Sequence, residues 1–64
     1  MKKPVEVGKE YNVSITEVSR RGDGVARVKG FVIFVPRAKK GESHKIKITR
    51  VFERYATAEI VKEM

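Results

Sequence analysis

The feature that most constrains this fold is an unbroken apolar run, FVIFV at residues 31–35, followed directly by Pro36. β-branched and aromatic residues favour strands, and a proline ends a strand because its nitrogen has no hydrogen to donate. Successive side chains of a strand point to opposite faces, so the run carries large apolar groups on both. A 64-residue chain has only one thin core. One face of this strand therefore needs a role besides core packing.

Shorter segments of alternating apolar and polar residues predict four more strands. They are 11–15, 25–28, 44–51 and 55–61, with inner sets that include Tyr11 and Val13, Ile46 and Ile48, and Ala56, Ala58 and Ile60. The apolar phase changes at Val18 and at Val51, which predicts two bends. No segment has a helical period of 3.6 residues. We expect an all-β fold, a small closed five-stranded antiparallel barrel, because closure removes exposed strand edges.

Three connections are indicated by their composition. Residues 19–24, with glycines on both sides of Asp23, predict a tight turn, and Lys29-Gly30 predicts a two-residue hairpin loop. The glycine pair does not make a phosphate-binding loop, because it lacks a following helix and a Lys-Ser/Thr end. Residues 36–43 hold three bases and few apolar groups. We expect this segment to be a solvated, mobile loop.

The charge distribution is the strongest indication of function. The chain has 15 Lys and Arg against 8 Asp and Glu, and residues 20–54 alone carry a net charge of +8. A concentrated positive field attracts polyanions, which favours nucleic acid as a partner over a surface that only maintains solubility. The candidate phosphate-binding residues are Arg20, Arg21, Arg27, Lys29, Arg37, Lys39, Lys40, Lys45 and Lys47.

Phe31 and Phe34 are the candidate rings for stacking on bases, an interaction that tolerates any sequence. Strict alternation places them on opposite faces of their strand. Either the strand coils enough to bring both rings to one side, or one of them is in the core. We expect Tyr11, Phe52 and Tyr55 to be core or partly buried.

Several functional classes lack support in the sequence. Without cysteine there is no disulfide or thiolate metal site, and the default setting is reduced and cytoplasmic. No apolar run approaches the ~20 residues of a membrane span, and the N-terminus has no signal-peptide pattern. His44 is the single histidine, and no serine has a base placed by a motif. We expect no enzymatic activity, catalytic residue, metal, cofactor, membrane association or small-molecule substrate.

The chain resembles the TRAM domain, a small RNA-binding module, over nearly its whole length. The resemblance rests on the glycine pair with Val25-Ala26-Arg27, on Gly30 and the strand that ends at Pro36, on Gly41-Glu42, on Ile46 with Ile48, and on Tyr55 with Ala58. It implies a five-stranded barrel similar to the oligonucleotide-binding (OB) fold and RNA as the partner. Free-standing members, found mainly in archaea, have been proposed as cold-shock-like RNA chaperones. Residues 37–40 depart from the family, where less charged residues are common.

Together these observations predict one domain over residues 1–64, with a frayed tail at 1–6, that acts as a monomer. We expect a low-specificity RNA chaperone that needs no ATP and binds single-stranded or partly unpaired RNA, including structured tRNA or rRNA, by charge and stacking. Two alternatives remain open at this point. One is a subunit of the ribosome or of an RNA-modification complex, and the other is a chromatin-type barrel that binds duplex DNA.

Overall fold

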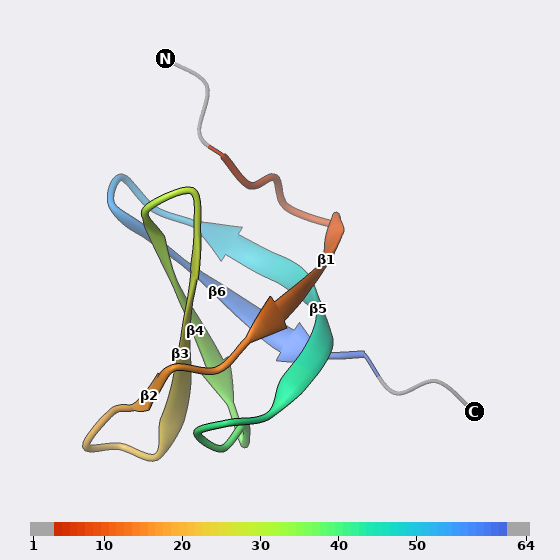
Figure 1. Ribbon diagram of the computed structural model, residues 1–64. Coiled ribbons are helices and arrows are strands. Elements are labelled where there is room, and N and C mark those ends of the chain that lie inside the picture. The colour runs from red at the N-terminus through yellow and green to blue at the C-terminus, as the bar shows by residue number, and fades with distance from the viewer. Residues whose placement is uncertain (1–3, 62–64) are drawn as a thin grey trace.

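Six strands form a single curled sheet in the computed structural model, which describes residues 4–61 (Figure 1). The expectation of an all-β fold is confirmed, and no helix able to cross a membrane occurs among these residues. The order of strands across the sheet is β1-β5-β6-β4-β3-β2. Their bounds are β1 Glu10–Ser14, β2 Glu17–Val18, β3 Asp23–Val28, β4 Phe31–Pro36, β5 Ser43–Val51 and β6 Tyr55–Ile60.

The sixth strand arises because the first strand breaks at the predicted bend. β1 and β2 are separated only by Ile15 and Thr16, yet they lie at the two opposite edges of the sheet. Ile15 is buried, and the Thr16 N–H donates to the Val25 carbonyl oxygen at 2.9 Å. The chain therefore bridges the two edges and curls the sheet into a partial barrel. Counted as one bent strand, β1 and β2 restore the five strands of an OB-like barrel.

One strand pair corrects the expectation of a purely antiparallel sheet. β4 and β6 pair in parallel, with Val32 opposite Tyr55 and Phe34 opposite Thr57. The reason is the connection, because β5 follows β4 in the chain but pairs with β6 and β1 instead. The second predicted bend is present as a register shift between Ile48 and Arg50, where β5 pairs with β6.

The core follows the alternation expected from the sequence. β4 places Phe31, Ile33 and Val35 inside and its other residues outside. They pack with buried side chains of every strand except β2, among them Val13, Ala26, Ile46, Ile48, Ala56 and Ala58. Val5 also lies in this core with an exposed fraction of 2%. The expectation of a frayed tail is therefore wrong at Val5, whereas residues 1–3 lie outside the described part of the chain.

The basic segment 36–43 is exposed as expected except at Ala38, and backbone hydrogen bonds anchor it to the chain. Ala38 is buried, and Gly41 and Glu42 exchange backbone hydrogen bonds of 2.9 and 2.8 Å with Ile15. The missing side chain of Gly24 makes room for Ala38. A small residue on each side thus lets the loop close over the end of the barrel.

Gly24→Ala is expected to destabilise the fold by about 1–3 kcal/mol, the usual cost of overpacking a core. A Cβ on Gly24 would lie 2.6 Å from the Ala38 Cβ and 3.0 Å from the Ala38 carbonyl oxygen. The free energy of unfolding, measured by chemical denaturation, reports the loss. Ala38→Gly in the same chain removes the nearer contact and should recover part of it. An undiminished loss in the double variant would contradict a steric cause.

Candidate nucleic-acid interface

The outer face of β4 is the place where apolar side chains are left out of the core. Val32 and Phe34 point away from the barrel interior and are half-buried. Cross-strand pairing sets Tyr55 of β6 on one side of Val32 and Arg27 of β3 on the other. Since paired residues share a face of the sheet, this outer surface combines rings with a guanidinium group.

Three rings on this face form one aromatic cluster, Phe34, Phe52 and Tyr55. The Phe52 and Tyr55 rings are stacked with their centroids 4.6 Å apart and their planes 18° apart. Tyr55 also meets Phe34 edge to face, at 5.6 Å and 80°. Tyr55 is 39% exposed, and the other two rings are half-buried. Their mutual contacts hold the rings in place while parts of them remain accessible to a ligand.

The aromatic cluster forms one wall of an open concavity of about 760 Å³. Apart from Val32 of β4, the rest of the lining is polar or charged and comes from the β2–β3 turn, the start of β3, the β5–β6 turn and β6. The lining residues are Ser19, Arg20, Arg21, Asp23, Val32, Phe34, Phe52, Arg54, Tyr55 and Thr57. The concavity thus offers stacking surfaces beside three guanidinium groups.

The two turns that line the concavity lie at opposite ends of β4 (Figure 1). The β2–β3 turn directly precedes Asp23, which pairs with Pro36 at the end of β4. The β5–β6 turn directly precedes Tyr55, which pairs with Val32 near the start of β4. The parallel pairing of β4 and β6 therefore determines where Phe52 and Arg54 stand relative to Phe34.

The structure divides the residues expected to contact nucleic acid. Arg20, Arg21 and Phe34 line the concavity, and Arg27 borders it beside Val32. Six others lie outside it. Lys29 is in the β3–β4 turn; Arg37, Lys39 and Lys40 are in the β4–β5 loop; Lys45 and Lys47 are on β5, where Lys47 pairs with Glu10 and Glu59.

The expectation that the Phe31 ring is available to stack on bases is wrong. It is only 9% exposed and belongs to the core, because it alternates with Val32 and shares the face of Ile33. The strand does not coil enough to bring Phe31 and Phe34 to one side. Phe34 is the accessible ring of the two.

Sequence reasoning missed Phe52, Arg54 and Tyr55 as members of the site. Phe52 and Tyr55 were expected to be core or partly buried, and Arg54 was counted only in the net charge of residues 20–54. One signal was available, because two aromatic residues flank an arginine within four positions, 52–55, where the chain passes from one predicted strand to the next. Turn residues are exposed, so rings in a turn are candidates for binding.

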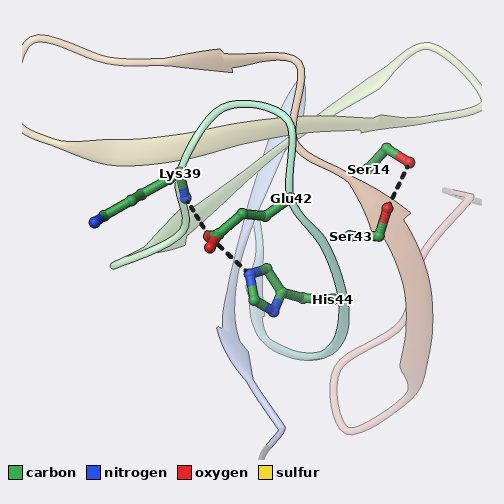
Figure 2. Close-up of polar contacts among 5 residues, drawn as sticks. All are labelled: Ser14, Lys39, Glu42, Ser43 and His44. Atoms are coloured by element: carbon green, nitrogen blue, oxygen red, sulfur yellow. Dashed lines mark hydrogen bonds and ion pairs between the residues drawn. The ribbon is translucent and has the colours of Figure 1, made fainter.

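A polar cluster joins the β4–β5 loop to the start of β5 (Figure 2). None of its residues lines the concavity. The Glu42 carboxylate accepts a 2.8 Å hydrogen bond from the Lys39 backbone N–H and lies 3.0 Å from His44 Nε2. Ser14 and Ser43 hydroxyls pair separately at 3.3 Å. Within residues 4–61 no hydrogen bond joins a serine to His44, and no group of acidic and histidine side chains could hold a metal ion. This cluster fastens the loop.

The pKa of Glu42 is lowered from its ordinary 4.5, first by the hydrogen bond with His44 and then by the Lys39 N–H. A carboxyl with a lowered pKa in the folded state contributes stability above its unfolded pKa, and this contribution is lost as pH falls through the folded value. Glu42→Gln is therefore expected to lower the unfolding temperature slightly at neutral pH. The difference from the wild type should shrink below about pH 4.5. Thermal melts of both proteins across pH 3–7 test this, and a constant difference would contradict it.

Comparisons of family, sequence and structure all match this chain to small proteins or domains of one kind. The TRAM domain family model matches residues 4–61. An uncharacterized protein of Methanocaldococcus jannaschii is 52% identical over 88% of this chain and 73% of its own length. A solution structure of a conserved protein from Methanococcus maripaludis superimposes with a TM-score of 0.90 and 51% identity, covering 95% of this chain and 87% of that one.

Two longer relatives are a translation factor subunit and a ribosomal RNA methyltransferase. The translation initiation factor 2 subunit beta of Thermoplasma volcanium is 51% identical over 89% of this chain. The ribosomal RNA large subunit methyltransferase E of Methanothrix thermoacetophila is 41% identical over 95% of this chain. This chain spans only 27% and 24% of their respective lengths. The similarity therefore concerns one part of each relative.

Proposed function

This chain belongs to the TRAM domain family, and from its aromatic and arginine-lined concavity we propose that it binds single-stranded or partly unpaired RNA without acting as an enzyme. The observation that carries the proposal is the placement of Phe34, Phe52 and Tyr55 in one wall beside Arg20, Arg21 and Arg54. Bases in a duplex are already stacked on each other. Exposed rings therefore favour unpaired bases, and the guanidinium groups neutralise the phosphates that link those bases.

The position of the concavity supports the same function. OB folds bind oligonucleotides on the face of their second and third strands and with the loops beside it. When β1 and β2 are counted as one strand, β3 and β4 are the second and third. The concavity uses their outer face, the turn before β3 and the turn before β6. Relatives active in translation and in ribosomal RNA modification are compatible with an RNA partner.

Binding of this kind gives chaperone activity without ATP. A protein that binds unpaired RNA and not the duplex lowers the free energy of the open state by mass action. A free protein concentration one hundred times the dissociation constant stabilises the open RNA by about 2.7 kcal/mol. This offsets the stacking free energy of one or two base-pair steps. We propose that the protein opens short RNA structures in this way, in the cytoplasm and as a monomer.

A second candidate function rests on the longer relatives. A domain that forms a quarter of a translation factor subunit or a ribosomal RNA methyltransferase can serve as the RNA-contacting part of a larger assembly. The free chain would then work as a subunit of a translation or RNA-modification complex. Stoichiometric co-sedimentation with ribosomal particles would favour this role, whereas dispersed binding to many RNAs would favour the chaperone.

The deciding experiment is a titration of single-stranded RNA, duplex RNA and duplex DNA at one salt concentration, followed by a salt series. We expect a preference for single-stranded RNA. If Arg20, Arg21, Arg27 and Arg54 each neutralise one phosphate, log K should fall with log salt at a slope of about −2.8. A preference for duplex DNA with bending would instead indicate a chromatin-type barrel. An affinity that does not depend on salt would contradict the role of the arginines.

Matched charge variants localise the interface. Arg54→Gln removes one guanidinium group from the concavity and should make the salt slope shallower by about 0.7. Lys47→Gln removes the same charge from β5, where Glu10 and Glu59 flank the lysine across the sheet. It should change the slope little. Equal effects of both variants would indicate a diffuse basic surface instead of a defined site.

A further inference from the structure

One residue of the concavity has the wrong charge for a phosphate-binding surface. Asp23 begins β3, is half-buried, and lines the concavity together with Arg20, Arg21 and the aromatic cluster. Asp23 pairs with Pro36 across the sheet. Pro36 lies two residues after Phe34 and therefore on the same outer face of β4. The carboxylate therefore lies on the same face as the rings and not on the side of the core.

The Asp23 carboxylate takes no part in holding the fold. The residue donates its backbone N–H to Ser19 Oγ at 3.2 Å, and its carbonyl oxygen accepts from the Ser19 N–H at 2.8 Å. These bonds involve the backbone of Asp23 alone. Among residues 4–61 the carboxylate has neither a hydrogen bond nor an ion pair, although guanidinium groups line the same concavity. An acceptor group is thus left available to a ligand.

A carboxylate at this position weakens binding to a polyanion in general. Like charges repel, and the partly enclosed surface screens this repulsion less than open water does. The charge is compensated only if the ligand offers donors to it. Unpaired RNA has such donors in its bases and in its ribose 2′-hydroxyls, whereas the phosphates and the ring faces carry none. Of these, only the base donors differ from one nucleotide to the next.

Guanine is the base whose donors match a carboxylate best. Its Watson–Crick edge presents N1–H and the N2 amino group side by side, so both oxygens of one carboxylate can accept in parallel. Adenine and cytosine present one amino group beside an acceptor nitrogen, and uracil presents N3–H between two carbonyls. Single-stranded RNA exposes these edges for recognition.

We infer that Asp23 is a specificity-determining residue that accepts hydrogen bonds from the Watson–Crick edge of an unpaired guanine stacked on the aromatic cluster. The inference rests on the proposed function and adds a base preference to it. A bidentate contact of this kind distinguishes bases by about 5- to 150-fold. The protein therefore binds unpaired RNA broadly but holds guanine-containing segments most tightly.

The first test uses the wild-type protein and base analogues. Fluorescence anisotropy compares a uridine octamer with octamers that carry one central guanosine, inosine or 7-deazaguanosine. Inosine lacks the N2 amino group, whereas 7-deazaguanosine keeps the whole Watson–Crick edge. We expect guanosine and 7-deazaguanosine to bind equally and at least about 5-fold more tightly than uridine, with inosine between them. Equal binding of inosine and guanosine would overturn the bidentate contact.

The second test uses charge variants of the protein. Asp23→Asn should reduce the guanosine-to-uridine ratio and strengthen binding to the uridine octamer. Glu53→Gln removes an exposed acid from the adjoining β5–β6 turn without changing the lining, and should keep the ratio. If Asp23→Asn strengthens binding to all octamers alike, Asp23 acts only by repulsion and the inference is wrong. If Asp23→Asn does not fold, the analogue series decides.

The outcomes separate the inference from the proposed function. A wild-type protein that binds all octamers with the same affinity disproves the guanine contact and leaves RNA binding intact. A wild-type protein that binds none of them disproves the proposed function, and the inference fails with it.

Discussion

Phe34→Ala is expected to weaken binding to single-stranded RNA by about 5- to 150-fold, because one base–ring stack contributes about 1–3 kcal/mol. The ring is half-buried on the outer face of β4 and supports Tyr55 edge to face. Its removal takes away a stacking surface and also loosens the neighbouring ring. Fluorescence anisotropy with a labelled octamer measures the loss, and a thermal melt checks that the variant is folded.

The matched control for this prediction keeps the ring. Phe34→Tyr should bind RNA nearly as well as the wild type, since the added hydroxyl can reach water from the concavity. Tyr55→Ala should behave like Phe34→Ala, because both rings belong to the same wall. A folded Phe34→Ala protein with unchanged affinity would exclude stacking at this site.

Phe31→Ala is expected to have the opposite profile, a large loss of stability with no specific loss of RNA contacts. Phe31 is 9% exposed in the core, and truncation of a buried phenylalanine costs about 3–5 kcal/mol. At about 0.05–0.15 kcal/mol per residue, a domain of this size has a total free energy of unfolding of only about 3–10 kcal/mol. Chemical denaturation should therefore find the variant close to unfolding at ordinary temperature.

A conservative variant separates the effect of a cavity in the core from the effect of losing the aromatic ring. Phe31→Leu retains most of the apolar volume and should lose clearly less stability than Phe31→Ala. Its RNA affinity, measured where the protein is folded, should match that of the wild type. Stable folding of Phe31→Ala together with weak RNA binding would place this ring at the interface after all.

Local pattern was sufficient to predict the strands and their faces. A period of two residues assigned Ile46, Ile48, Ala56 and Ala58 to the inside, and all four are buried. The same rule placed Phe31 and Phe34 on opposite faces, but it could not say which face was the core. That depends on the phase of the neighbouring strands. Phe31 shares its face with Ile33, which pairs with the fully buried Ala26 and Ala56.

The composition of the site was harder to predict because it depends on pairings between distant segments. Charge alone suggested nine basic residues, yet Lys47 lies between Glu10 and Glu59, and Arg54 enters the concavity only through the parallel pairing of β4 and β6. Both the pairing of Lys47 and the placement of Arg54 join segments that are far apart in the sequence, so local pattern does not reveal them. The burial of Ala38 within the basic loop was also not predicted, because Ala38 needs the space at Gly24, 14 positions away, to become buried.

The course of the chain around β5 makes this domain suitable for attachment to other proteins. Near the N-terminus, Gly8 donates to the Ile48 carbonyl oxygen, and near the C-terminus Val61 donates to that of Lys45. Both ends of the described chain therefore run beside β5 (Figure 1). The concavity, in contrast, is lined by residues of β3, β4, β6 and two turns. A polypeptide joined at either end would leave from the β5 side. The same domain can thus be carried within a larger protein while the concavity stays unobstructed.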